Sequence, residues 1–208
     1  MSPITETIRR PIGTLLVLVF LSCPWPTQAA DDSPIPVVEV FHEALLATMK
    51  DAEALGVEGR FTKLEPAVSS AFHLPAMIQV ASGSHWKKAD EKAQDQLIAA
   101  FSRLSVATYA AQFDGYSGQS FETLGNKPGP QKTTLVETRI VNPGDDSVAI
   151  TYVMKKAKGV WRIVDVLVDT GISELARKRS EYRRVLKAGG IPALVDTLKK
   201  KADDLLLP

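Results

Sequence analysis

The first half of the chain carries apolar residues at three- and four-residue spacing, the pattern of amphipathic helices. One such stripe begins at Val37 and runs to two glycines, Gly56 and Gly59, which we expect to end the helix. Asp90 is the expected N-cap of the longest predicted helix, because a short carboxylate accepts bonds from the free N–H groups of a first turn. Three helices are predicted after the first one: 60–72, 74–82 and 88–113.

In the next part of the chain the apolar residues recur at every second position, and β-branched residues are frequent. Short turns that each contain a glycine separate the segments, which predicts an antiparallel meander. In the third segment, Val148, Ile150, Tyr152 and Met154 alternate with other residues and share one face. The predicted strands lie within residues 120–125, 133–141, 147–154 and 161–171.

Helical spacing returns in residues 173–190 and 192–205, which Gly189 and Gly190 separate. The order is therefore helices, a four-stranded sheet and helices again. This order predicts an α+β fold in which several helices pack on one face of a curved antiparallel sheet. Residues 30–208 contain no internal repeat and no dividing linker, so we expect one domain there.

Residues 1–29 have the organisation of a cleaved secretory signal peptide. Two adjacent arginines precede the apolar stretch 11–21, which is too short to span a bilayer comfortably. Thr27 and Ala29 are the small residues that suit cleavage after Ala29, and we therefore expect a periplasmic protein. The alternative is a lipoprotein anchored at Cys23, since FLSC is a loose lipobox. Cleavage after Ala29 would leave no cysteine in the mature chain.

Composition narrows the classes of protein. The 208 residues are 45% hydrophobic, which suits a globular domain with a sizeable core. The formal net charge is only +1, whereas general nucleic-acid binding requires a large basic excess. We expect no nucleic-acid partner.

Two aspartates interrupt the last predicted strand, and their spacing argues against a catalytic pair. Asp165 and Asp169 are four residues apart, so on a regular strand they lie about 13 Å apart at about 3.3 Å per residue. Glycosidase carboxylates need about 5 to 9.5 Å. Without a bulge, these side chains cannot form such a dyad. We interpret Asp165 as a paired or backbone-bonded carboxylate, Asp169 as a strand-end residue, and the strand as covered on both faces.

Few other residues suggest a metal site or a catalytic site. The three histidines, His42, His73 and His85, lack a second His or Cys at metal-ligand spacing. The chain also lacks a nucleophile elbow, a Walker loop and a dinucleotide fingerprint. We predict no metal, no cofactor and no catalytic residue, although a triad scattered along the chain would not be visible in this way.

One segment concentrates positive charge on a predicted helix. Its simplest interpretation is a solvated face, and the alternative is a docking surface for an acidic partner or for anionic headgroups. Arg179 differs from the others, because it falls on the apolar stripe of the helix, from where it could meet a lipid headgroup or Asp165. The candidate docking residues are Arg177, Lys178, Arg179, Arg183 and Arg184, with Lys187 just beyond them.

Three long segments together resemble a known family. They are GRFTKLEPAVSSAFHLPAMIQVASGSHW, FSRLSVATYAAQFDGYSGQSFETLG and WRIVDVLVDTGISELARKRSEYRRVLKAGGIPALVDTLKKKADDL. In order and spacing they are similar to the toluene-tolerance, or MlaC, family of periplasmic lipid-binding proteins, over about residues 37–205. FDGYSGQSF and VLKAGGIPALV are most similar to the hopanoid-associated HpnM branch.

The resemblance implies a carrier that performs no chemistry. Such a protein holds lipid tails between sheet and helices and exchanges them with membrane complexes in outer-membrane lipid homeostasis. The transporter partner would be an ABC-type system for phospholipids or an RND-type exporter for hopanoids. We expect a monomer.

Physical chemistry alone is compatible with a lipid slot, because each buried CH₂ group contributes about 0.8 kcal/mol. Sequence does not separate a core residue from a cavity residue, since both are apolar. Our candidates for lipid contact are Ile78, Phe101, Tyr109, Val136, Ile150, Tyr152, Val164, Val166, Val168 and Leu194.

Two other classes of function compete with the carrier. The first is a secreted enzyme of similar architecture, which needs a titratable residue in its pocket, with Asp165 or His73 as the suspects. The second is a non-catalytic scaffold that binds protein through the basic helix face. A tightly packed interior without a cavity would favour the scaffold.

Overall fold

The structure is a computed structural model that describes residues 32–169 and 171–207. By its internal contacts the chain divides into the units Met1–Asp32 and Ser33–Pro208. The predicted signal peptide and the alternative anchor at Cys23 lie outside the described residues. None of the helices in the described part has the length and apolar character needed to cross a bilayer.

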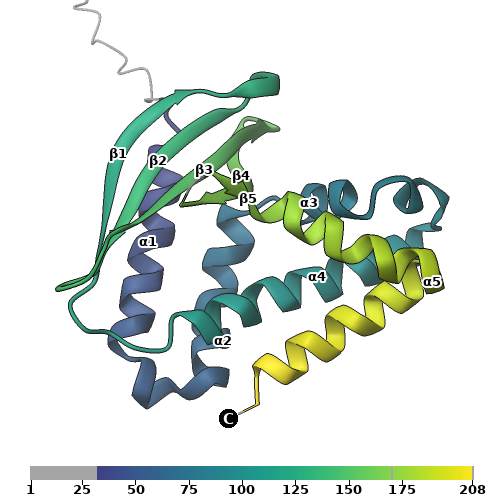
Figure 1. The fold of residues 1–208 in the computed structure, drawn as a ribbon, viewed down its shortest axis with the longest axis horizontal. Helices are drawn as coiled ribbons and strands as arrows, with labels where there is room; N and C mark the ends of the chain where they lie inside the picture. The colour runs from purple at the N-terminus through teal and green to yellow at the C-terminus, as the bar shows by residue number, and fades with distance from the viewer. Residues whose placement is uncertain (1–31, 170, 208) are drawn as a thin grey trace, which may run out of the picture. The chain divides into compact units, whose positions relative to one another are not determined.

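Unit Ser33–Pro208 has the predicted α+β architecture, with helices before and after an antiparallel sheet (Figure 1). The helices are α1 (Ile35–Lys50), α2 (Ala52–Ala71), α3 (Leu74–Ser82), α4 (Glu91–Gln112) and α5 (Glu174–Leu205), with short 3-10 helices η1 (Gly83–Lys88) and η2 (Pro130–Lys132). The strands are β1 (Ser120–Pro128), β2 (Thr134–Val141), β3 (Val148–Ala157), β4 (Val160–Val168) and β5 (Ile172–Ser173).

The first predicted helix boundary was wrong. Helix α1 ends at Lys50, and α2 begins at Ala52 and continues past Gly56 to Ala71. Gly56 has a φ of 59°, a conformation that residues with a side chain rarely adopt, and it breaks α2 internally without ending α1. The Lys63 ammonium joins the two helices by donating to the Ala47 carbonyl oxygen at 2.9 Å.

Helices α3 and α4 follow their sequence signals closely. Helix α3 occupies the predicted residues 74–82, with Pro75 in its first turn, where no intrahelical N–H bond is lost. The Asp90 carboxylate accepts a bond from Ala93 N at 2.7 Å and caps α4, as predicted. At the other end of α4, the buried Arg60 donates from Nε to the Ala110 carbonyl oxygen at 2.7 Å.

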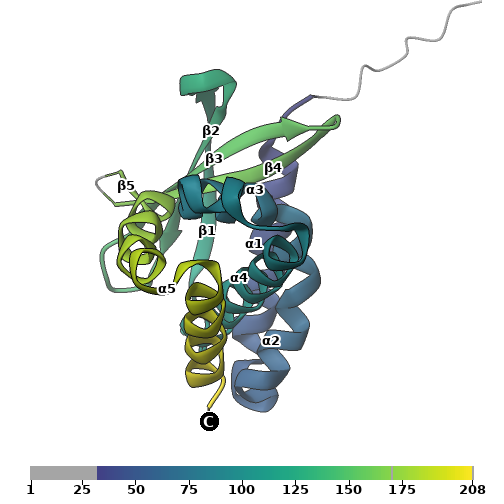
Figure 2. The same cartoon turned by 90° about the vertical axis from the view of Figure 1, so that its right-hand side faces the viewer.

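The sheet is a meander in the order β1-β2-β3-β4-β5 with antiparallel neighbours. It has one strand more than the four predicted, because two residues after the turn at Gly171 pair with the end of β4. In Figure 1 the sheet lies to the left of α3, α4 and α5, and in the turned view of Figure 2 these helices stand in front of the strands.

All five buried strand residues of the described sheet lie on its inner face, which the helices cover: Val136, Thr138, Tyr152, Met154 and Ile163. The expectation that β4 is covered on both faces holds in part. Its outer face carries half-buried residues, among them Asp165 and Leu167.

A bulge in β4 changes which residues share a face. Ile163 pairs with Met154 and Val166 pairs with Tyr152, so Val164 is the additional residue between two regular stretches. Ile163 and Val166 consequently point to the same face although they are three residues apart. At the same place the Ile163 carbonyl oxygen accepts a bond from His73 N at 2.8 Å, which ties the start of α3 to the sheet.

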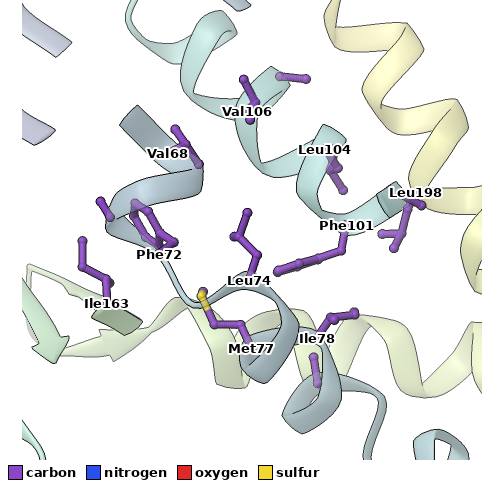
Figure 3. Close-up of a cluster of buried hydrophobic side chains, with 14 of the residues drawn as sticks. Val68, Phe72, Leu74, Met77, Ile78, Phe101, Leu104, Val106, Ile163 and Leu198 are labelled. Carbon is purple, nitrogen blue, oxygen red and sulfur yellow. The ribbon is translucent and has the colours of Figure 1, made fainter. Parts of the chain in front are cut away.

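The core lies between the inner face of the sheet and α1 to α5. Figure 3 shows Phe72 beside Ile163 of the sheet, and Leu74, Met77 and Phe101 gathered between α3 and α4. Beyond the core, part of the space between helices and sheet is not filled by side chains.

Candidate functional site

A cavity of about 560 Å³ lies between the inner face of the sheet and the helices. This volume is within the range of about 300 to 1,000 Å³ that is usual for small-molecule sites. Its lining is mostly apolar and comes from α1, α3, α4 and α5, from β2, β3 and β4, and from the loops after α2, α4 and β2.

The sheet side of the cavity follows from alternation along two paired strands. Ile150 and Tyr152 of β3 are two residues apart and point inward, with Val168 and Val166 as their partners on β4. These four side chains therefore form one continuous apolar surface. The bulge at Val164 places Val166 and Val168 on this inner face together with Ile163.

The helix side is aromatic and rigidly packed. Phe101 and Tyr109 of α4 both line the cavity, and Phe72 joins them from the end of α2. The Phe41 ring lies behind them, with its centroid 5.2 Å from the centroids of both Phe72 and Tyr109 in edge-on geometry. Edge-on contacts of this kind are favourable, so they stabilise the wall in this arrangement.

Behind the cavity wall, the buried His42 gives the Tyr152 hydroxyl a hydrogen-bond partner. His42 Nε2 lies 2.9 Å from the Tyr152 hydroxyl oxygen, and the imidazole stacks on Phe121 with centroids 4.1 Å apart. Burial lowers the pKa of His42 to about 4, so the imidazole is neutral at pH 7. Burial also raises the pKa of Tyr152 well above its ordinary value, so the phenol stays protonated.

Two hydroxyl groups of the lining bond to carbonyl groups within α4. Ser105 Oγ donates to the Phe101 carbonyl oxygen at 2.8 Å, and Thr108 Oγ1 donates to the Leu104 carbonyl oxygen at 2.7 Å. Within residues 32–169 and 171–207, no group of three potential metal-ligating side chains is close enough to hold an ion. Among the described residues, the cavity therefore offers a mostly apolar volume.

Charged groups enter the cavity at the start of α5. Glu174, Arg177 and Lys178 line this end, and Arg177 Nη2 donates to a Glu174 carboxylate oxygen at 2.5 Å. The hydrogen bond to Glu174 raises the pKa of Arg177. Burial lowers the pKa of Lys178, and the neighbouring Arg177 lowers it further.

The position of this end is set by Asp165, which has the structural role we expected. Its Oδ1 accepts bonds from Val166 N at 2.8 Å and Leu175 N at 3.0 Å. Its Oδ2 accepts from Ser173 Oγ at 2.5 Å, and Ser173 in turn caps α5. One carboxylate thus fixes β4, β5 and the first turn of α5 together.

Neither suspect for an enzyme lines the cavity. His73 Nδ1 accepts from Ala76 N at 3.3 Å and caps α3, while Asp165 caps α5. Asp169 lies at the end of β4, as predicted, with a φ of 49° and its backbone N–H donated to the Ala149 carbonyl oxygen at 2.9 Å. A tightly packed interior would have favoured the protein-binding scaffold, and the cavity shows that the interior is not packed in this way.

Six of the ten candidate lipid contacts line the cavity: Phe101, Tyr109, Ile150, Tyr152, Val166 and Val168. Ile78, Val136 and Leu194 are fully buried in the core and do not reach it. Val164 is the half-buried bulge residue of β4 and does not line it either. Contact of any of these residues with a lipid stays a prediction.

The structure divides the basic helix residues differently from the sequence. Arg177, which is partly exposed, and the half-buried Lys178 line the cavity, whereas Arg179, Arg183 and Arg184 are exposed on α5 and lie outside it. Placing Arg179 on the apolar stripe was wrong. Lys178 takes that position, because it is three residues after Leu175 and four before the buried Tyr182.

Several lining residues were not among the sequence candidates, including Met49, Met77, Phe113 and Ile140. Met77 and Met49 belong to the apolar stripes of α3 and α1, so their burial could be predicted. Which buried residue faces empty space depends on packing between distant elements, and no local signal reports it.

Comparison with known proteins agrees with this fold. The family model described as MlaC protein matches residues 39–200. A solved phospholipid-binding protein from Ralstonia solanacearum, in complex with a phospholipid, is similar with a TM-score of 0.71 and 22% identity, and the match covers 82% of this chain and 97% of that one. At this identity the likeness concerns the fold. No curated protein matches the chain.

Proposed function

Because the chain belongs to the MlaC family, we propose that its cavity binds the acyl chains of a phospholipid and that the protein is a lipid carrier, not an enzyme. The observation that carries this proposal is the mostly apolar cavity of about 560 Å³ between sheet and helices. The protein from Ralstonia solanacearum, which shares the fold, is described as phospholipid-binding and was solved with a phospholipid.

The lining explains how binding would be driven. The joined surface of Ile150, Tyr152, Val166 and Val168 offers apolar contact without polar groups that a chain would leave unpaired. Each CH₂ group moved from water to such a surface contributes about 0.8 kcal/mol. An acyl chain of ordinary length therefore needs no specific polar contact to bind.

The proposed place of action is the periplasm, supported by the signal-peptide pattern of residues 1–29. There the protein would act as a monomer that shuttles lipid between membrane complexes and contributes to outer-membrane lipid homeostasis. The inner-membrane partner would be an ABC-type transporter, or an RND-type transporter if the chain belongs to the HpnM branch.

The lipid of the HpnM branch would be a hopanoid. The segments FDGYSGQSF and VLKAGGIPALV support this finer assignment by resemblance alone. The first segment contributes Phe113, Asp114, Gly115 and Gln119 to the cavity lining, so it lies where ligand selectivity would act. Identification of the bound lipid decides between hopanoid and phospholipid.

The docking surface for the transporter would be the exposed basic face of α5, formed by Arg179, Arg183 and Arg184. Arg177 and Lys178 adjoin this face from the cavity end. A basic face favours a partner with acidic residues, because opposite charges steer association at long range.

Filling the cavity tests the central proposal. The double variant Ile150→Trp, Val166→Trp adds two bulky rings to the apolar surface, and we expect it to lose displaceable binding of a fluorescent phospholipid. The matched control, Leu124→Trp with Val160→Trp, adds the same rings at exposed strand positions and should bind like the unaltered protein. Equal binding by both double variants, each folded by circular dichroism, would contradict the proposal.

A further inference from the structure

A second cavity of about 310 Å³ adjoins the first between α4 and α5. The two cavities share three lining residues: Thr108, Arg177 and Lys178. The smaller one also contains the side chains of Tyr182, Lys201 and two acidic residues. A ligand in the larger cavity therefore has a polar compartment beside its charged end.

Most charges around the smaller cavity are already paired. Arg177 binds Glu174, Lys201 binds Glu181, and Asp204 pairs with Lys200 at 3.3 Å. Lys178 makes no ion pair with any described residue. Its pKa is lowered mainly by burial and then by Arg177, against the opposing influence of Glu174 and Glu181. The compartment thus holds one half-buried cation, Lys178, that has no ion-pair partner among the described residues.

A hydrogen-bond donor without a partner lies one turn further along α5. Tyr182 is 2% exposed, and its hydroxyl is the one buried side-chain polar atom of the described residues with no hydrogen bond. Lys178 and Tyr182 are four residues apart, so they are neighbours on the same helix face. An unpaired buried hydroxyl costs free energy, and a ligand oxygen at this position would recover it.

We propose that this compartment binds a phosphate group between the Lys178 ammonium and the Tyr182 hydroxyl. The phosphate is that of the lipid whose chains occupy the larger cavity, so the inference rests on the proposed function. A phosphodiester carries one negative charge and two terminal oxygens, which match one unpaired cation and one unpaired donor. Charge-assisted bonds of this kind are about twice as strong as neutral ones.

The test compares two lipids that share their acyl chains and differ in the phosphoglycerol headgroup. Dioctanoyl phosphatidylglycerol and dioctanoylglycerol carry the same chains, and their affinities are measured by titration calorimetry. We expect Lys178→Met to weaken phosphatidylglycerol binding about tenfold relative to dioctanoylglycerol binding, because the lost charge acts on the phosphate and not on the chains. Lys187→Met, which removes an exposed lysine of the same helix outside both cavities, should change neither affinity.

A second variant guards against a folding artefact. Tyr182→Phe removes only the hydroxyl, which is buried without a partner, so we expect a stability no lower than that of the unaltered protein and a several-fold weaker affinity for phosphatidylglycerol. Both variants binding the two lipids as the unaltered protein does would overturn the phosphate site while leaving the lipid cavity in place. Failure of the unaltered protein to bind either lipid would overturn the proposed function itself.

Free phosphate is distinguished by a third titration. Inorganic phosphate alone should bind the unaltered protein weakly or not at all, because it lacks the chains that hold a lipid in the larger cavity. Tight binding of inorganic phosphate that Lys178→Met abolishes, with no preference between the two lipids, would overturn the link between this compartment and the lipid.

Discussion

At the scale of single residues, a buried polar side chain, His42, supports the wall of the cavity. His42 is 4% exposed behind the cavity wall, where it bonds the Tyr152 hydroxyl and stacks on Phe121. An imidazole in this position fixes the orientation of Tyr152, which lines the cavity. The neutral form suits the site, because a charge there would be separated from water without an acidic partner.

Burial of His42 makes stability depend on pH. The pKa of His42 is about 4 in the folded protein and 6.5 when unfolded, so the unfolded chain binds more protons between these values. The contribution is fully present above pH 6.5 and is lost as pH falls toward about 4. His42→Gln does not titrate, so the stability difference between the two proteins should shrink by about 3 kcal/mol from pH 7 to pH 4.

Urea unfolding at several pH values measures this difference. Carboxylates titrate in both proteins, so their contributions cancel in the comparison. Loss of the stacking and hydrogen-bond contacts lowers the stability of His42→Gln by an amount that does not depend on pH. The prediction therefore concerns only how the stability difference between the two proteins changes with pH. A stability difference that stays constant from pH 7 to pH 4 would contradict a buried neutral imidazole.

At the scale of elements, much of the fold could be predicted from local signals. Pro75 and Asp90 located the starts of α3 and α4, and the alternation from Val148 to Met154 gave the inner face of β3. The bulge at Val164 could not be predicted in this way. It lies where the Ile163 carbonyl oxygen accepts the bond from His73 N, a residue from a distant part of the sequence.

The same limit applies to the candidate site. Ile78 and Phe101 are both apolar and buried, yet Phe101 alone of the two lines the cavity. The difference arises from how α3 and α4 pack against the sheet, which no pattern within one helix encodes. The charged residue at the end of the cavity was assigned wrongly for a simpler reason. Lys178 and Arg179 are adjacent in a continuous basic segment, so a shift of one residue exchanges them on the helix face.

The junction of β4, β5 and α5 gives a prediction at this scale. Asp165→Ala removes the acceptor of two backbone N–H bonds and of the Ser173 hydroxyl bond, and should lower the free energy of unfolding by about 2 kcal/mol. Asp95→Ala, at an exposed position within α4, should change it by less than about 0.5 kcal/mol. Equal effects in chemical denaturation would contradict the capping role of Asp165.

At the scale of the whole molecule, the central feature of unit Ser33–Pro208 is an incompletely filled space. The helices cover the inner face of the sheet, and their side chains leave a cavity of about 560 Å³ whose wall is held by packed aromatic rings. Protein interiors are normally close-packed, so an apolar space of this size is costly unless a ligand fills it. Lipid chains are the occupant that matches both the lining and the family.

Native mass spectrometry of the protein purified from its own cell envelope, with extraction and identification of any bound lipid, tests the central claim most directly. The account predicts one co-purifying lipid per protein molecule, and a phospholipid would support the general family function. A hopanoid would support the HpnM branch. An empty protein that also takes up no lipid in vitro would contradict the carrier function.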